Sequence, residues 1–253
     1  MYRIGALIVF LLFAAGPANA QGVSDKPIRL LVGFTPGGSA DLAARAVVDG
    51  MGSALGRPIV VENRPGAGSI VAAAAVARAD PDGSTLLFGS ISLSVQAAID
   101  PALPLDMLSD LIPVGLVSEA PNVLVVNPQL PVRSVSELIA HAKSQSLSFA
   151  SGGTATTQHL AGEIFKEAAR IDIVHVPYKG SGPALNDLMG GRVHLMFDNL
   201  STSMQLIKAG RLRVLAVTTP RRTRQLPDVP TMVEAGFDNF ENSVWFGVFA
   251  PKN

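Results

Sequence analysis

Two short loops rich in glycine and hydroxyl side chains carry the groups best suited to holding a small ligand. The first, Thr35-Pro36-Gly37-Gly38-Ser39, lies between an apolar run and a helical pattern. Its two glycines let backbone amides come close to a ligand, and the next helix offers unpaired N–H groups and the positive end of its dipole. A carboxylate or phosphate suits such a place. A simple turn with Ser39 or Asp41 as helix N-cap accounts for the same residues equally well.

The second loop, residues 151–157, occupies the corresponding place in the second half of the chain. It reads Ser-Gly-Gly-Thr-Ala-Thr-Thr and holds several hydroxyls but no charge. Backbone amides and hydroxyls could wrap a small polar ligand, although Thr156 or Thr157 could equally serve as an N-cap. In open α/β sheets, ligands collect where strands end and helices begin. Two such loops, one in each half, favour a site that both halves share.

Three further positions are candidates with structural alternatives. Tyr178-Lys179-Gly180 follows a strand, and Lys179 is best interpreted as part of a solvated turn. Asp198 ends another strand, where it could accept hydrogen bonds from a ligand or cap the next helix. His159 lies in the first turn of a helix, where a lone histidine is more often structural than catalytic.

The composition argues against several classes of function. The chain has 253 residues, no cysteine and equal numbers of basic and acidic residues, 20 of each. Zero net charge and 6% aromatic residues disfavour nucleic acid or an anionic membrane surface as a partner. The four histidines lack metal-binding spacing, so neither a metal nor a cofactor is expected. Nucleophile-elbow, Walker A and dinucleotide motifs are absent, although a catalytic site assembled from distant residues stays open.

The N-terminus has the layout of a cleavable secretory signal. Arg3 precedes an apolar run over residues 4–15, and Ala18-Asn19-Ala20 supplies the small residues of a cleavage site. A run of about 12 residues is too short to span a bilayer, which needs ~20. Residues 1–20 are therefore predicted to be removed, which leaves a protein exported to a periplasm.

Short apolar runs alternate with helical patterns along the rest of the chain, and this alternation predicts an α/β fold with a mostly parallel sheet between helices. Residues 90–121 give no clear prediction, because Pro101, Pro104 and Pro113 break any long element. Strands are expected at 28–34, 59–61, 85–88, 123–126, 147–150, 173–176, 193–197 and 214–217, and helices at 41–55, 70–79, 134–142, 160–168, 184–189 and 204–209.

Several stretches, taken together, are similar to one known family. They include Phe34-Thr35-Pro36-Gly37-Gly38-Ser39-Ala40-Asp41, Val61-Glu62-Asn63-Arg64-Pro65-Gly66-Ala67-Gly68, His175-Val176-Pro177-Tyr178-Lys179-Gly180, Met196-Phe197-Asp198-Asn199 and Trp245-Phe246-Gly247. This combination, spread over residues 27–247, resembles the Bug (TctC-type) extracytoplasmic solute receptors of tripartite tricarboxylate transporters.

The resemblance implies a two-lobed, type II periplasmic-binding-protein fold with a small organic acid held between the lobes. The first lobe would comprise residues 21–120 and 221–253, and the second residues 121–220. Family members continue past the Trp-Phe-Gly stretch, so the C-terminal part of the first lobe is expected to be missing here. Backbone amides, hydroxyls and waters would hold the ligand carboxylate. The implied ligand-binding residues are Phe34, Thr35, Gly37, Gly38, Ser39, Asp41, Ser151, Gly153, Thr154, Thr157, His159, Tyr178 and Asp198.

The chain departs from the family pattern in two places near this site. Thr157-Gln158 precedes His159 where the family usually has a Ser/Thr-Pro pair. The stretch 89–113 is also shorter, which keeps Ser90 and Ser92 out of the candidate set.

These observations predict a periplasmic receptor that delivers a small organic acid or related metabolite to membrane transporter subunits, or presents it to a sensor kinase domain. A secreted hydrolase or isomerase using the same cleft is the alternative from another class. A ligand-sensing adaptor that never feeds a transporter is a third.

Overall fold

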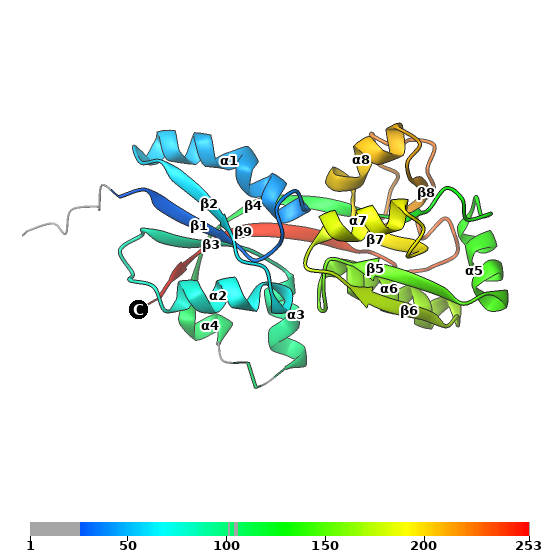
Figure 1. Ribbon diagram of the computed structural model, residues 1–253, viewed down its shortest axis with the longest axis horizontal. Coiled ribbons are helices and arrows are strands. Elements are labelled where there is room, and N and C mark those ends of the chain that lie inside the picture. Colours follow the sequence, from blue (N-terminus) through cyan, green and yellow to red (C-terminus); the bar gives the residue numbers. More distant parts are fainter. Residues whose placement is uncertain (1–25, 101, 104–105, 253) are drawn as a thin grey trace, which may run out of the picture.

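The computed structural model describes residues 26–100, 102–103 and 106–252. The predicted signal sequence, residues 1–20, lies outside these ranges. Within them, no helix combines the length and the apolar character needed to cross a membrane. Figure 1 shows two groups of strands and helices, joined by two long strands that run between them.

The first half of the molecule is built on parallel strands in the order β2-β1-β3, with helices on both faces. Alternate residues of a strand point to opposite faces of its sheet. Leu30 and Val32 therefore join the core beneath one helix, α1, while Leu31 joins the core beneath another, α2. The elements are β1 (Ile28–Val32), α1 (Ser39–Leu55), β2 (Ile59–Asn63), η1 (Ala67–Ser69), α2 (Ile70–Ala77), β3 (Thr85–Ser90), α3 (Ser92–Ile99) and α4 (Met107–Asp110).

The second half repeats this plan with the parallel strand order β7-β5-β6. One core contains Phe149, Phe165 and Phe197, and a second core lies on the other face of the sheet around Leu185 and Leu188. The elements are α5 (Val135–Ser144), β5 (Leu147–Ser151), α6 (Thr157–Ala169), β6 (Ile173–Pro177), α7 (Ser181–Met189), β7 (Leu195–Asn199), α8 (Leu200–Lys208) and β8 (Arg213–Val217).

Two long strands connect the halves and differ from what the sequence predicts. β4 (Leu111–Val126) and β9 (Ser243–Pro251) pair antiparallel, and β4 then continues into antiparallel pairs with β7 and β8. Only the last four residues of β4 were expected to form a strand. Pro113 and Pro121 hide the rest in the sequence, and the register shift beside Pro113 shows how a sheet accommodates a residue with no N–H to donate. The mostly parallel prediction is therefore confirmed for the outer strands and wrong for the central ones.

The return of the chain to the first half also lies later than expected. Residues 221–253 were assigned to the first lobe, but Met232 and Phe240 belong to a core of the second half. The ring of Phe240 stacks on Phe197 with centroids 5.5 Å apart. Val244 and Phe246 are the residues that join the first half's core. The crossing therefore falls at about residues 242–243, because the aromatic contacts hold the preceding segment to the second half.

Candidate functional site

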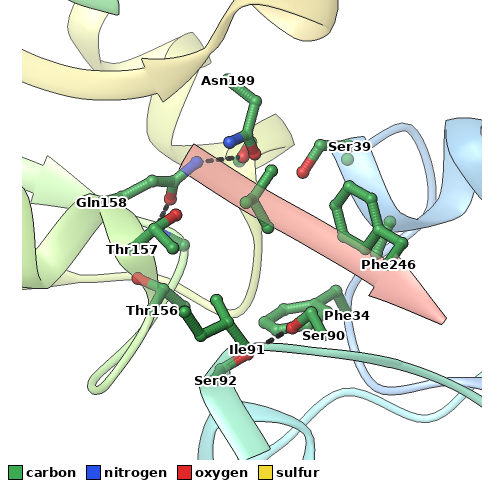
Figure 2. A pocket seen from close by; sticks show the side chains of 15 residues that line it. Phe34, Ser39, Ser90, Ile91, Ser92, Thr156, Thr157, Gln158, Asn199 and Phe246 are labelled. Carbon is green, nitrogen blue, oxygen red and sulfur yellow. Dashed lines mark hydrogen bonds between the residues drawn. The ribbon is translucent and has the colours of Figure 1, made fainter. Parts of the chain in front are cut away.

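A pocket lies between the two halves and encloses about 370 Å³ of empty space, part of it open to solvent. Both halves supply its wall, and none of the side chains in that wall is charged. Figure 2 shows Thr157 and Gln158 on one side, facing Phe34 and Phe246 on the other. The lining residues are Phe34, Gly38, Ser39, Ala40, Ser90, Ile91, Ser92, Gly152, Thr156, Thr157, Gln158, Ser181, Asn199, Val244 and Phe246.

Five helices begin at this wall. Ser39, Ser92, Thr157 and Ser181 are the first residues of α1, α3, α6 and α7, and Asn199 immediately precedes α8. No side chain caps the N-terminus of α1, α3, α7 or α8. The first N–H groups of these helices thus lack side-chain caps and lie at the positive dipole ends. Such an arrangement attracts an anion without an arginine or lysine.

The wall from the second half is an interlocked polar network centred on Gln158. Its Nε2 donates to Ser181 Oγ at 2.7 Å and to Asp198 Oδ1 at 2.8 Å, while its Oε1 accepts from Gly152 N. Gln158 is only 3% exposed, so these partners fix which way its amide points. The network ties the starts of α6 and α7 to the end of β7.

Asp198 lies behind this wall and does not line the pocket, contrary to the implied ligand contact. It is completely buried, and Thr202 Oγ1 and Ser203 Oγ each donate to its Oδ2 at 2.6 Å. Burial raises the pKa of Asp198, and these hydroxyl donors act in the opposite direction. Its role in this arrangement is to hold Gln158 in place.

The wall from the first half is mostly apolar. Phe34 and Ile91 lie there together with Val244 and Phe246 of β9. Phe246 stacks on Phe88 in the core behind it, with centroids 5.7 Å apart. This wall therefore contributes mainly shape and water exclusion, and its polar groups are the starts of α1 and α3 and the hydroxyls of Ser90 and Ser92.

The loops of the two halves touch directly beside the pocket. Thr35 N donates to the carbonyl of Lys179 at 3.1 Å. Gly180 has a φ of 151°, and a Cβ there would lie 2.3 Å from Thr35 Oγ1, so glycine is required for the contact. Thr35 therefore joins the halves and is absent from the pocket wall.

Two other predicted residues shape the first loop from outside the pocket. Gly37 N donates to Asp41 Oδ2 at 2.9 Å, and Arg45 pairs with Asp41 Oδ1 at 3.0 Å. Hydrogen bonds from Arg45, Gly37 and Asn63 lower the pKa of Asp41, although burial, the largest single influence, opposes them. Asp41 is thus a buried, ionised anchor of the turn, which agrees with its structural interpretation.

Ser151 and His159 support the second loop from behind. Ser151 Oγ lies 2.7 Å from His175 Nε2, and Ala155 N donates to His159 Nδ1 at 3.2 Å. The two imidazole rings stack with centroids 4.1 Å apart. Burial lowers the pKa of His159 and, with the neighbouring His159, lowers the pKa of His175 to about 4. Both rings are therefore neutral near neutral pH and act as packing for the loop.

The remaining predicted residues divide between two pockets. Phe34, Gly38, Ser39 and Thr157 line the pocket described above. Gly153, Thr154 and Tyr178 line a second pocket next to it. The predicted set lacks six polar residues of the first pocket: Ser90, Ser92, Thr156, Gln158, Ser181 and Asn199. Ser90 and Ser92 had been kept out of the candidate set and line the pocket nonetheless. All six lie at or next to the start of a helix, so a search of every strand-to-helix junction would have found them.

A protein-family model matches most of the chain. The family model described as "Tripartite tricarboxylate transporter family receptor" matches residues 43–253. The chain belongs to this family. It is a family of periplasmic solute receptors and not of enzymes, which confirms the receptor prediction over the hydrolase or isomerase alternative.

Similar proteins support the same assignment. Protein BugT of Bordetella pertussis is 40% identical over 259 residues, covering all of this chain and 79% of BugT. The solved structure of the periplasmic binding protein BugD is 34% identical with a TM-score of 0.88, over 91% of this chain and 78% of BugD. The R. palustris protein Rpa4515, solved with adipate, is 38% identical with a TM-score of 0.87, over 90% of this chain and 77% of Rpa4515. The receptor therefore has the α/β periplasmic-binding-protein fold.

Proposed function

We propose that this receptor captures the carboxylate of a small organic acid in the pocket between its halves. The observation that carries the proposal is the convergence of five helix N-termini on a wall with no charged side chain. An anion gains from these N–H groups and dipoles, whereas a cation finds no counter-charge in the wall. The uncharged Ser39 and Thr157 hydroxyls can donate further hydrogen bonds.

Helix dipoles alone do not account for useful affinity. Each helix end typically contributes about 0.3–1 kcal/mol, so five typically contribute about 1.5–5 kcal/mol. Micromolar binding requires about 8 kcal/mol. The remainder must come from charge-assisted hydrogen bonds, at about 1.5–3 kcal/mol each, and from exclusion of water as the halves close. The contact between Thr35 and Lys179 belongs to such a closed arrangement.

The finer architecture that we propose is the two-lobed, type II form of the fold. One lobe would comprise the first half with β9, and the other would extend from residue 121 to about 242. The packing of Met232 and Phe240 in the second half supports this later boundary. The hinge would then consist of β4 and the residues just before β9, where the chain crosses between the halves.

Three asparagines connect the pocket to this hinge. The side chain of Asn199, in the pocket wall, donates to Asn122 Oδ1, and Asn122 Nδ2 donates to Asn242 Oδ1. Thr218 Oγ1 adds a bond of 2.8 Å to the carbonyl of Asn122. Asn122 lies in β4 and Asn242 immediately precedes β9, so a ligand that touches Asn199 reaches both crossing segments through two side-chain contacts.

The proposed ligands and partners follow from the family. Rpa4515 was solved with adipate, and a dicarboxylate is accordingly the first ligand class to test here. Membrane transporter subunits would receive the ligand, and a sensor kinase domain is a further proposed partner. Residues 1–20 would direct export to the periplasm.

A ligand screen tests the proposal directly. Thermal shift followed by calorimetry would compare mono-, di- and tricarboxylates, amino acids and nicotinate, each paired with its neutral amide. We expect at least one carboxylate to stabilise the folded receptor while its amide does not, because only the anion gains from the helix termini. If a protein shown to be folded responds to no carboxylate, or responds equally to the amides, the proposal is wrong.

A further inference from the structure

A second pocket adjoins the first and is also built from both halves. It encloses about 560 Å³ of empty space, part of it open to solvent. Phe34 and Gly152 line both pockets, so the two share a boundary. Residues 66–68 of the first half face the second half's loops at 152–154 and 177–179 across it. The carboxylate proposed above does not use this space.

The wall of the second pocket differs from that of the first in its charge. Lys179 is exposed there, and its ammonium group forms no ion pair or hydrogen bond with the residues that the structure describes. No aspartate or glutamate lines this pocket. The exposed Thr154 supplies a hydroxyl with no hydrogen-bond partner among the described residues. The other polar side chain, Tyr178, donates its hydroxyl to Asp187 Oδ2 at 2.7 Å and is already engaged.

The first half faces Lys179 across the second pocket with the turn at residues 66–68. Gly66, Ala67 and Gly68 have φ values of 151°, 43° and 58°, a run of left-handed geometry that brings backbone to the surface in place of side chains. A Cβ at Gly68 would lie 2.9 Å from the carbonyl of Thr154, so the two halves approach closely at this point. The pocket therefore exists in the closed arrangement and is bounded by both halves.

We propose that this second pocket receives the far carboxylate of an extended dicarboxylate whose near carboxylate occupies the first pocket, with Lys179 as the counter-ion of the far group. The inference rests on the proposed function, since it assigns the near carboxylate to the helix termini. It separates two tasks: backbone dipoles hold the carboxylate common to all ligands, and one lysine detects a second charge at a distance. The chain between the two carboxylates would pass between Phe34 and Gly152, the two residues common to both walls.

Ligand length provides the first test. Calorimetry on the purified receptor would compare linear dicarboxylates of increasing length, from malonate to sebacate, with monocarboxylates of the same chain length. We expect the second carboxylate to improve affinity about two- to fivefold once the chain is long enough to pass Phe34, and to give no gain for the shortest members. The gain should shrink as salt is raised, because Lys179 is exposed.

A charge variant provides the second test. Lys179→Gln should remove the dicarboxylate gain while monocarboxylate affinity changes less than twofold, and Lys179→Arg should retain it. Lys208→Gln is the matched control, because Lys208 is exposed at the far end of α8 and should change neither affinity.

The outcomes separate this inference from the proposed function. Suppose that monocarboxylates bind the unmodified receptor. If Lys179→Gln then lowers the affinities for mono- and dicarboxylates by the same factor, or lowers neither affinity, the second pocket does not hold a carboxylate. Two ligands bound per receptor would also overturn the inference, because it requires one molecule to span both pockets. If no carboxylate binds the unmodified receptor, the proposed function fails, and this inference fails with it.

Discussion

The two walls of the ligand pocket are built on different principles. The second half supplies Gln158, Ser181 and Asn199, whose side chains are buried. Gln158 is hydrogen-bonded to Ser181 and Asp198, and Asn199 is hydrogen-bonded to Asn122. The first half supplies the rings of Phe34 and Phe246, the uncapped starts of α1 and α3, and the hydroxyls of Ser90 and Ser92, which bond to each other. One wall is a fixed polar frame, and the other is a smooth surface with backbone donors at its edge.

This difference indicates how the receptor divides recognition between its halves. A frame whose amides and hydroxyls are already oriented loses little entropy when a carboxylate arrives. An apolar wall makes few directional demands, so its shape selects the body of the ligand more than its charged group. We therefore expect damage to the frame to abolish binding, and damage to the smooth wall to reduce or redirect it.

The largest expected effect comes from breaking the frame at its centre. Gln158→Leu keeps the approximate size but leaves Gly152 N, Ser181 and the buried Asp198 without their partner. We expect affinity for a bound carboxylate to fall at least a hundredfold and the free energy of unfolding to fall by about 1–3 kcal/mol. Calorimetry and urea unfolding measure the two effects. Gln205→Leu, an exposed change on α8, is the control. Binding that survives intact would show that the frame is dispensable.

A somewhat smaller loss of ligand affinity is expected from a substitution at Gly38, where the first half meets the frame. A Cβ at Gly38 would lie 3.6 Å from Ser181 N, an ordinary contact, whereas the branched side chain of Gly38→Val extends further into the space at the helix start. We expect Gly38→Val to lower affinity more than tenfold with little change in stability, and Gly38→Ala to lower it only slightly.

The comparison of these two variants is the control for the loop. If the alanine and valine variants both bind as tightly as the unmodified receptor, the loop at Gly38 is a turn with no part in binding. Their melting temperatures, measured without ligand, identify any loss that comes from folding alone.

The hinge link offers a moderate test of how the walls move together. Asn122→Ala removes the middle member of the asparagine chain between Asn199 and Asn242. We expect ligand affinity to fall about five- to tenfold. Asn199 loses the partner that orients its side chain, and the hydrogen-bonded connection between the pocket and the hinge is broken. Small-angle scattering with and without ligand would measure closure. A variant that closes and binds like the unmodified receptor would contradict the proposed coupling.

The smallest expected effect is a dependence of stability on pH that arises from His175 in the second half. His175, with its pKa lowered to about 4, stays neutral when folded, while in the unfolded chain it takes up a proton near pH 6.5. Stability is therefore greatest above pH 6.5 and falls as pH drops towards 4, by at most ~1.4 kcal/mol per pH unit and less because the ring is half-exposed.

A variant isolates this contribution from others in the same range. The raised pKa of the buried Asp198 acts in the opposite sense, since the folded state then takes up a proton more readily. His175→Gln leaves Asp198 in place and should flatten the fall in stability between pH 6.5 and 4.5. Urea unfolding at several pH values measures the free energy of unfolding. If it changes with pH equally in the variant and the unmodified protein, His175 does not contribute to the pH dependence.

The sequence could predict features that depend on local backbone structure better than features that depend on contacts between distant side chains. The loop at 35–39 and the strands and helices around it are local features, marked by glycine spacing and apolar periodicity, and of the loop Gly38 and Ser39 line the pocket. The long strand β4 was not, because its two prolines break the local pattern while tertiary pairing with β9 overrides it.

The polar frame was missed for a similar reason. Gln158 is one residue after the predicted Thr157, but its partners lie at Gly152, Ser181 and Asp198, on three different elements. No local pattern in the sequence reports such contacts. Asp198 was implied to contact the ligand and instead supports Gln158, a distinction that depends on a side chain's direction in the folded protein.

The most direct test of the central claim is a crystal structure of the receptor with a carboxylate identified by the ligand screen. The account predicts one carboxylate group in the first pocket, within hydrogen-bond distance of the backbone N–H groups at the starts of α1 and α7, with no arginine or lysine side chain touching that group. A carboxylate held there by a basic side chain, or a ligand bound outside the space between the two halves, would contradict it.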